Sequence, residues 1–459
     1  MGDAVADLTD ADALKLIGKT VGKWNKPENL MGAVWLLTGL AKQRSKAGDE
    51  VLAGLADDVS ERDIYFGSAF IEALASAGRT DMGHLLPPLL AEYNSRWENE
   101  RWLFALTVLA ACPRLVSAKD NDTRFEVVLK LADILDKAKD DRIRWFTSKA
   151  LGDISGKPPY VQSQYWRWWV KVGGVTPDDQ PEHEGKTSTG KRPPAFFDAE
   201  AVGKRVVFVI DVSGSMSSPV EMGEDPPSPK TDKKDGPVSG KRKGDKDDDK
   251  KDDEIEKPDY SGVVTKLDLA KVELIFTLKN LPQDYSFNIV TYGSTHSMLI
   301  QSRSEFVQAT DTNKQTFIKK VEQLEVMGAT NIHGALNRAF CINEKKSLDP
   351  ADMMNGKADP ASDLNCLLGG ATTIFFLTDG SPNVSDEKNP PDRVADPMAR
   401  PRFTVTENII LEVRRLNLFR RAVIHTVGIG PHPRPLLEGL AKATGGQYID
   451  RSGQHQLPD

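Results

Sequence analysis

Residues 205–216 constrain the fold of this chain more than any other stretch of its sequence. They open with an unbroken apolar run, Val206–Ile210, in which most side chains are β-branched. Such a run predicts a strand that is buried on both faces, at the centre of a parallel sheet. Asp211, Ser213 and Ser215 follow directly, so a carboxylate and two hydroxyls are expected at the carboxyl end of that strand. Open α/β sheets bind their ligands at this edge.

Two later segments add oxygen donors of the same kind. Thr330 lies in a loop that enters an amphipathic stretch, and a second apolar run, Thr373–Leu377, ends close to Asp379 and Gly380. Carboxylates and hydroxyls without a thiol or imidazole suit Mg²⁺, Mn²⁺ or Ca²⁺ better than zinc or copper. Each motif alone has an ordinary alternative: Asp-x-Ser-x-Ser is common in turns and caps, a Thr before a helix is commonly its N-cap, and Asp-Gly often forms a turn.

In this order, and with a strand before both acids, the segments resemble the von Willebrand factor A (VWA) domain. The metal-ion-dependent adhesion site of that family is Asp-x-Ser-x-Ser, then a Thr, then an Asp. All five positions are present here: Asp211, Ser213, Ser215, Thr330 and Asp379. The resemblance implies that these residues hold Mg²⁺, or else Mn²⁺ or Ca²⁺. With few anionic ligands such an ion stays electrophilic, so we expect an exposed Asp or Glu of a protein partner to complete its coordination shell.

The residues after Asp211 alternate between helical and extended patterns. Helices are predicted over 266–281, 315–324, 332–341, 405–418 and 436–444, and strands over 286–291, 421–427 and 445–449. This alternation predicts a doubly wound, mostly parallel sheet. The expected fold class over residues 204–453 is therefore α/β and Rossmann-like, in agreement with the VWA resemblance.

Two insertions interrupt the predicted α/β domain. Residues 221–259 carry 14 acidic and 10 basic side chains and few large apolar ones, so this segment is expected to be disordered. Its acidic core lacks the glycine that an EF-hand calcium loop needs at its turn, which favours a solvated charge run. Residues 343–371 are polar and are expected to form a surface loop.

The first 173 residues have a different pattern. Helical periodicity recurs without strands over 12–19, 30–42, 64–77, 84–93, 102–111, 125–137 and 143–154. Paired helices with short turns predict an all-α, solenoid-like domain. Leu151-Gly152, followed by the aromatic run Tyr165–Trp169, loosely resembles the closing segment of bacterial HEAT-like repeats. We expect these tryptophans to seal the last repeat rather than to form a peptide groove, and residues 174–203 to be a linker.

Composition disfavours several classes of protein. The chain of 459 residues has a formal net charge of −7 and no basic face with interleaved aromatic residues, so no nucleic-acid partner is expected. No apolar run reaches membrane length, and the N-terminus has no signal-peptide pattern. A cytoplasmic location is the default expectation, and an exported form stays open if Met1 replaces a removed signal.

Motifs for catalysis are weak, so we expect no enzyme. Gly185–Lys191 fits part of a phosphate-binding loop, but Arg192 stands where a Ser or Thr is needed and no strand precedes it. His333 is the histidine nearest the site in sequence, and we expect it at a helix start facing the rim. The leading hypothesis is a metal-dependent protein-interaction module on a helical scaffold. The alternative is a regulatory or assembly subunit of a separate ATPase or of a chelatase-type metal-insertion complex.

Overall fold

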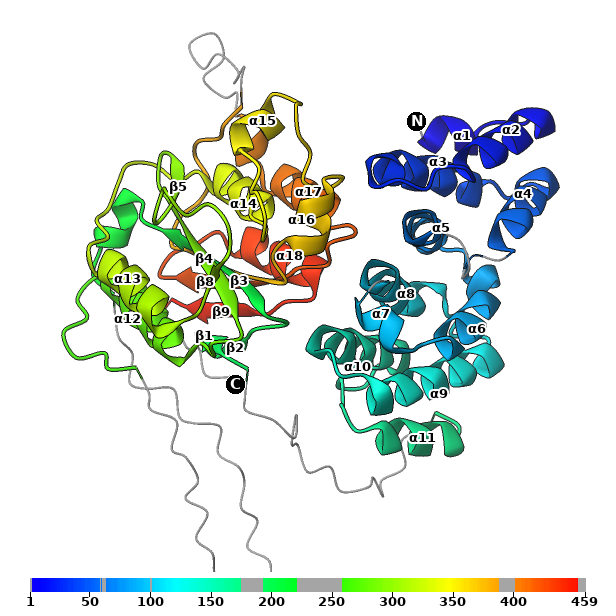
Figure 1. The fold of residues 1–459 in the computed structure, drawn as a ribbon, viewed down its shortest axis with the longest axis horizontal. Coiled ribbons are helices and arrows are strands. Elements are labelled where there is room, and N and C mark those ends of the chain that lie inside the picture. Colours follow the sequence, from blue (N-terminus) through cyan, green and yellow to red (C-terminus); the bar gives the residue numbers. More distant parts are fainter. Residues whose placement is uncertain are drawn as a thin grey trace, which may run out of the picture.

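The computed structural model of the chain describes residues 2–57, 59, 63–99, 101–174, 193–220, 258–387 and 401–452. These residues form two domains, one of helices and one built around a sheet, which lie side by side in Figure 1. Nearly all of the predicted disordered insertion 221–259, and most of the predicted linker 174–203, fall outside the described residues.

The amino-terminal domain is helical throughout its described residues. Its helices are α1 Gly2–Ala6, α2 Ala11–Val21, α3 Leu30–Lys42, α4 Lys46–Ala56, α5 Ile64–Ser76, α6 Leu86–Ala91, α7 Ser95–Asn99, α8 Trp102–Leu115, α9 Asn121–Lys137, α10 Asp141–Ser155 and α11 Ser163–Lys171, with 3₁₀ turns at Pro27–Asn29 and Thr80–Leu85. Asp10, Ser45, Asp120 and Asp140 cap α2, α4, α9 and α10, because each side chain accepts a hydrogen bond from a backbone N–H of the first turn. The HEAT-like repeat stays a prediction.

Each predicted helical range overlaps an observed helix, but α1, α4 and α7 fall outside those ranges. The helices α1 and α7 have only five residues each, whereas α4 has 11. Gly48 and Gly54 lower the intrinsic helix propensity of α4, so the sequence pattern did not predict this helix. Packing compensates for this weakness. A Cβ atom on Gly18 of α2 would lie 2.5 Å from Cγ1 of Val51, so the missing side chain lets α2 and α4 approach closely.

The second domain alternates strands and helices, as predicted. Its strands are β1 Ala195–Phe196, β2 Ala199–Glu200, β3 Arg205–Asp211, β4 Ser286–Tyr292, β5 His296–Met298, β6 Val307–Gln308, β7 Thr373–Thr378, β8 Val423–Ile429 and β9 Tyr448–Arg451. Its helices are α12 Lys266–Asn280, α13 Asp311–Glu322, α14 Ile332–Cys341, α15 Pro350–Met354, α16 Leu364–Gly369, α17 Thr406–Leu416 and α18 Arg434–Thr444, with 3₁₀ turns at Gly214–Ser217 and Arg402–Thr404.

The large sheet has the strand order β5-β4-β3-β7-β8-β9. All neighbours from β4 to β9 pair in parallel, and β5 and β6 add short antiparallel pairings to β4. Alternate residues of β3 pack on opposite faces: Phe208 joins the core under α12 and α13, and Val209 joins the core under α14, α17 and α18. The predicted doubly wound, mostly parallel sheet is confirmed, with β3 buried at its centre (Figure 1).

Two predicted boundaries need correction. The segment predicted as a surface loop, 343–371, contains α15 and α16, because Asp349 and Asp363 cap them, and it buries Cys366. At its carboxyl end the predicted linker 174–203 includes the β1–β2 hairpin. Phe196 of β1 is fully buried and packs edge-on against Phe208, so this end of the linker is part of the core.

The two domains are joined by a buried cluster of charges. Glu72 of α5 is 1% exposed and pairs with Arg114 of α8 and with Arg421, which precedes β8. Arg142 of α10 donates to the carbonyl oxygen of Arg420 over 2.9 Å. Burial pushes the pKa of Glu72 upward, but the two arginines outweigh it and hold this pKa at about 2. The helical domain therefore contacts the sheet domain through an ionised carboxylate.

Candidate metal centre

The five predicted ligands come from three segments that meet at the carboxyl edge of the sheet. Asp211 is the last residue of β3, and Asp379 directly follows β7. The two strands are parallel neighbours, with Ile210 opposite Leu377, so the two acids leave the same edge side by side. The chain goes from β3 to β4 on one side and later to β7 on the other, which makes this edge a topological switch point.

Hydrogen bonds connect the acids and hydroxyls directly. Ser215 Oγ donates to Asp379 Oδ1 over 2.7 Å and lies 3.1 Å from Ser213 Oγ. The backbone N–H of Ser213 donates to Asp211 Oδ1 over 2.7 Å, and the hydroxyl of Thr378 donates to Asp211 Oδ2 over 2.6 Å. Four of the predicted ligands thus form one cluster.

Thr330 approaches the same cluster from the loop before α14. A Cβ atom on Gly380 would lie 3.5 Å from both Ser215 Oγ and Thr330 Oγ1, so these two hydroxyls flank the same small space. Asn383 holds Thr330 from both sides, because its side chain accepts from the Thr330 N–H and its N–H donates to the Thr330 carbonyl. All five predicted residues therefore lie at one site.

Backbone hydrogen bonds fix the loops that carry these side chains. The N–H of Met327 donates to the carbonyl of Val212, and the N–H of Gly214 donates to the carbonyl of Gly328 over 2.9 Å. The N–H of Val212 donates to the carbonyl of Tyr292 at the end of β4. The geometry of the site is thus set by the main chain of three segments.

Burial makes the site electrostatically unusual. Asp211 and Asp379 are 0% and 2% exposed. Burial raises the pKa of Asp211 to about 6, and the nearby Asp379 adds to this shift, although hydrogen bonds from Thr378 and Ser213 oppose it. Two buried carboxylates in one cluster repel one another, and a positive charge between them would relieve this repulsion.

The donor set fits a hard divalent cation. Two carboxylates and three hydroxyls are oxygen ligands of the kind that Mg²⁺, Mn²⁺ and Ca²⁺ prefer. Within the described ranges no three His, Cys, Asp or Glu side chains gather into a metal-binding group, so a metal here would depend on the hydroxyls for its remaining protein ligands. The residues present therefore match a magnesium-like ion better than a transition metal that needs thiolates or imidazoles.

The sequence reading missed two residues that contact the acids. Thr378 donates to Asp211, and Lys266, the first residue of α12, places its ammonium 2.8 Å from Asp379 Oδ2. One feature of the sequence could have drawn attention to Lys266. This lysine directly follows Thr265, which begins a capping box, and a cation at the N-terminus of a helix is unfavourable because it opposes the helix dipole.

A second polar network borders the site. Asp386 accepts from the side-chain amide of Asn331 and from His296 Nε2 over 2.5 Å, while Arg338 Nε donates to His296 Nδ1. His333 does not face the rim as predicted, because the residue is 2% exposed and its ring stacks on Phe403 with the ring centroids 3.9 Å apart. Burial lowers the pKa of His333 to about 4, so this histidine is neutral at pH 7.

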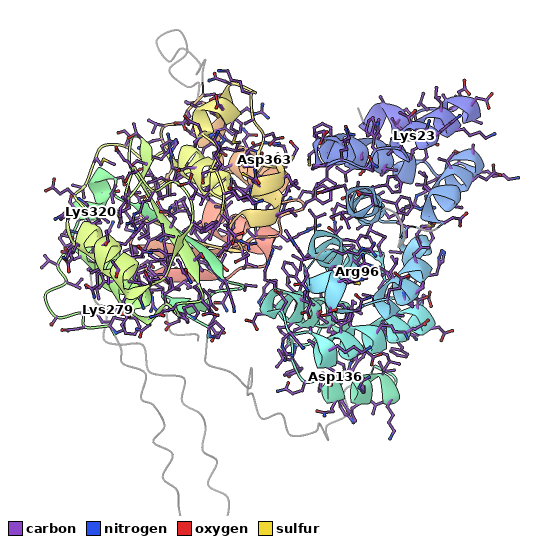
Figure 2. The ribbon with its side chains drawn as sticks, viewed as in Figure 1. Lys23, Arg96, Asp136, Lys279, Lys320 and Asp363 are labelled. Atoms are coloured by element: carbon purple, nitrogen blue, oxygen red, sulfur yellow. The ribbon has the colours of Figure 1, made fainter. Side chains whose placement is uncertain are left out.

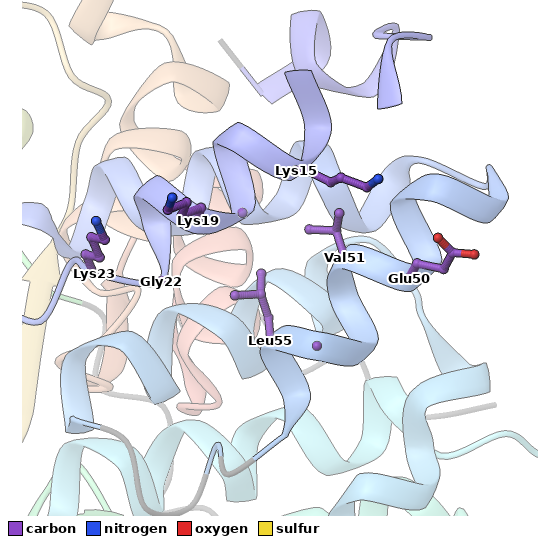
Figure 3. Close-up of a pocket in the computed structure, with 9 residues that line it drawn as sticks. Lys15, Lys19, Gly22, Lys23, Glu50, Val51 and Leu55 are labelled. Atoms are coloured by element: carbon purple, nitrogen blue, oxygen red, sulfur yellow. The ribbon is translucent and has the colours of Figure 1, made fainter. Parts of the chain in front are cut away.

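The helical domain has a different kind of hollow, of about 390 Å³, between α2 and α4 (Figure 3). Lys15 and Lys19 of α2 and Lys23, just beyond the end of α2, lie at its rim, and Val51 and Leu55 of α4 form its floor. These lysines form no ion pair with any described residue. Figure 2 labels Lys23 among the amino-terminal helices of this domain.

Comparison with known proteins agrees with the predicted fold. The family model of the von Willebrand factor type A domain matches residues 204–225 and 259–450, which contain all five candidate ligands. The central parallel sheet is that of a VWA fold, so the fold predicted from the sequence is confirmed. No curated protein matches the chain.

Solved structures with low similarity include two bacterial proteins. One is a von Willebrand factor type A protein from Catenulispora acidiphila, with 14% identity and a TM-score of 0.31 over 56% of this chain and 39% of that chain. The other is the PilB minor pilin from Streptococcus sanguinis, with 14% identity and a TM-score of 0.31 over 61% of this chain and 62% of that chain. The chain spans less than two thirds of the length of either protein. None of its described helices is long and apolar enough to span a bilayer.

Proposed function

We propose that the VWA domain of this chain, residues 204–450, is a divalent-metal-dependent protein-interaction module carried on a helical scaffold. VWA domains mediate protein interactions, and the family match covers the sheet domain from β3 through most of β9. The metal, its five ligands and an acidic group on the partner are our proposal. The observation that carries it is the convergence of Asp211, Ser213, Ser215, Thr330 and Asp379 at one sheet edge.

The chain's own residues would divide the work of holding the ion. Asp211 and Asp379 supply the negative charge, and the three hydroxyls supply neutral oxygens that leave the site's net charge unchanged. The backbone links between the loops hold these donors in place. A bound Mg²⁺ or Mn²⁺ would supply an electrophilic coordination position for a carboxylate oxygen from outside the chain.

The site supports binding better than catalysis, so we propose that the protein is not an enzyme. The hydroxyls of Ser213 and Ser215 bond to one another, and only that of Ser215 donates to Asp379, which is a ligand arrangement and not a nucleophile with its base. The buried imidazole nearest in sequence, His333, stacks on Phe403 and bonds Asn337. A hydrolase or transferase activity that needs the five residues would contradict this proposal.

A binding experiment on the full chain tests the proposal. Calorimetric titration with Mg²⁺ and Mn²⁺ should give one site, and Asp379→Asn should abolish it, since this change removes half of the anionic charge. Asp352→Asn on α15 is the matched control, because Asp352 is exposed and distant from the five ligands in sequence. Wild-type protein that binds neither ion would refute the proposal.

The interaction itself is tested by capture. Immobilised protein should retain its partner in Mg²⁺ and release it in EDTA, and Asp379→Asn should retain none. Retention that is unchanged by EDTA and by the mutation would mean that the contact surface lies elsewhere.

A further inference from the structure

We infer that Lys266 is a permanent positive charge at the metal edge, the carboxyl edge of the sheet that carries Asp211 and Asp379. This charge weakens metal binding and strengthens the capture of an outside carboxylate. This inference rests on the proposed function, because it concerns the charge of the same site. Lys266 is not one of the five family ligands, yet its Nζ lies 2.8 Å from Asp379 Oδ2.

The ion pair is buried on both sides. The side chain of Lys266 is 9% exposed and that of Asp379 is 0% exposed. Both oxygens of Asp379 are engaged, since Oδ1 accepts from Ser215 and Oδ2 accepts from Lys266. A lysine is rarely buried without a partner, so the contact is a specific part of the site.

The fold fixes where this ammonium lies. Thr265 and Asp268 form a capping box that begins α12 at Lys266. The N–H of Lys266 donates to the carbonyl of Ser218, which ties the start of α12 to the loop that carries Ser213 and Ser215.

The strand end beside it also makes room. Gly430 follows β8 with φ +57, and a Cβ atom there would lie 2.8 Å from Cε of Lys266. A residue with a side chain at this position would collide with the lysine stem. The space for the ammonium is thus provided by two elements, α12 and the end of β8.

A lysine at this position carries an electrostatic cost that the helix does not relieve. The amino end of a helix is its positive end, where acidic side chains are favoured and a cation is not. The charge of Lys266 and the dipole of α12 therefore both raise the potential at Asp379. A residue placed against the local preference in this way marks a functional constraint better than a structural one.

The consequence for the metal follows from whole charges. Asp211 and Asp379 together balance a divalent cation, and Lys266 leaves one positive charge over. This excess disfavours the metal but favours the carboxylate of a partner, because a like charge repels and an opposite charge attracts across a few ångströms of buried space. With Lys266 present, a bound metal ion therefore leaves the site with a positive charge that an outside carboxylate can neutralise.

Titration of the full-length protein tests the inference. Lys266→Met should bind Mn²⁺ about tenfold more tightly than the wild type, and it should bind acetate at the metal-loaded site about tenfold more weakly. Calorimetry measures the first quantity, and loss of Mn²⁺-enhanced water proton relaxation on adding acetate measures the second. Lys271→Met is the matched control, since Lys271 lies on the same helix and its ammonium bonds only the carbonyl of Glu322 in the described structure.

Two further variants keep the outcome decisive. Lys266→Arg retains the charge and should keep both affinities near the wild-type values. Lys266→Gln removes the charge but keeps a donor for Asp379, and it should act like Lys266→Met even if that variant melts early. Wild-type protein that binds no Mn²⁺ would refute the proposed function. Wild-type protein that binds Mn²⁺ with the same affinities for Mn²⁺ and acetate as Lys266→Gln would refute the role of Lys266 alone.

Discussion

The two domains treat charge in opposite ways. At the metal edge, Asp211, Asp379 and Lys266 are all buried and contact one another or the neighbouring hydroxyls. In the hollow of the helical domain, Lys15, Lys19 and Lys23 are exposed and pair with no described residue (Figure 3). Removing charges from water is costly, whereas a row of exposed lysines costs almost nothing.

This difference distinguishes a specific binding site from an ordinary charged surface. Buried charges that repel one another persist only where the surrounding structure holds them in place, as the hydrogen-bonded loops around Asp211 do. Exposed lysines such as Lys15 and Lys19 on α2 follow from the ordinary pattern of an amphipathic helix. We therefore expect mutations at the edge to change function strongly, and mutations in the hollow to change it little.

The largest expected effect is at Asp211. Asp211→Asn should abolish Mg²⁺ and Mn²⁺ binding, because an amide replaces a buried carboxylate ligand, while Asn can still accept from the Ser213 N–H. Without metal the variant should be more stable than the wild type at pH 7, by about 3 kcal/mol, since it removes a buried charge whose pKa is raised to about 6. Calorimetry and urea unfolding measure the two effects. Retained metal binding would contradict the ligand assignment.

The contact between the domains should be the next most sensitive place. Glu72→Gln leaves Arg114 and Arg421 without their shared carboxylate, and breaking a buried pair costs about 3 kcal/mol. The pKa of Glu72 is lowered to about 2, so its stabilisation is fully present above its ordinary pKa of 4.5 and is lost as the pH falls toward 2.

Urea unfolding of the wild type and Glu72→Gln at pH 7 and pH 3 tests this. The difference between the two proteins should shrink at pH 3. Glu50→Gln is the control, because the Glu50 side chain on α4 is exposed, and equal stability of Glu72→Gln and wild type at pH 7 would show that the cluster contributes nothing.

Metal binding itself should depend on pH through Asp211. Burial raises the pKa of this carboxyl to about 6, so the metal competes with a proton below that pH and with none above it. The affinity for Mg²⁺ should therefore be about tenfold weaker at pH 5 than at pH 7. An affinity that stays constant over this range would mean that Asp211 is ionised throughout.

A smaller effect is expected at Thr330. Thr330→Ala removes a neutral oxygen without changing the charge of the site, so metal affinity should fall only a few-fold. Capture of the partner should fall more, because this hydroxyl comes from the loop beside Gly380, where an outside oxygen would enter. Asn383→Ala removes the side-chain acceptor of the Thr330 N–H but keeps the Thr330 hydroxyl and the backbone bond to the Thr330 carbonyl, so it separates ligation from loop position. A Thr330→Ala variant that loses metal and partner in equal proportion would argue against a ligand-facing position.

The sequence was sufficient to predict an element or a site residue where a local pattern determines the local structure. The apolar run Val206–Ile210, with Asp211 after it, predicts both the central strand and the carboxylate at its end. It was not sufficient for contacts that only tertiary structure creates. Lys266 is 113 residues from Asp379 in sequence, and no period or motif connects them.

Short elements were missed for a similar reason. α15 and α16 have only a few residues each, and their caps, Asp349 and Asp363, look like ordinary loop residues in a polar stretch. The antiparallel strands β5 and β6 are two or three residues long and depend on pairing with β4. Local propensity cannot identify elements whose stability comes from their neighbours.

The smallest effect is expected in the hollow of the helical domain, where it tests whether the exposed lysines are functionally unimportant. Replacing Lys15, Lys19 and Lys23 together by Ser removes three exposed charges that no described residue neutralises. Surface substitutions of this kind change stability by about 0.5 kcal/mol or less, so the protein should fold and bind Mn²⁺ as the wild type does. Capture of the partner should remain sensitive to EDTA and unchanged in strength at physiological salt, where exposed charges more than about 8 Å apart are largely screened.

Gly54→Glu is a matched probe, because a Cβ atom there meets nothing within 4 Å and the new carboxylate can reach the lysines without a clash. If either variant weakens capture more than Thr330→Ala does, the lysine-lined hollow contributes to partner binding and the two domains act together.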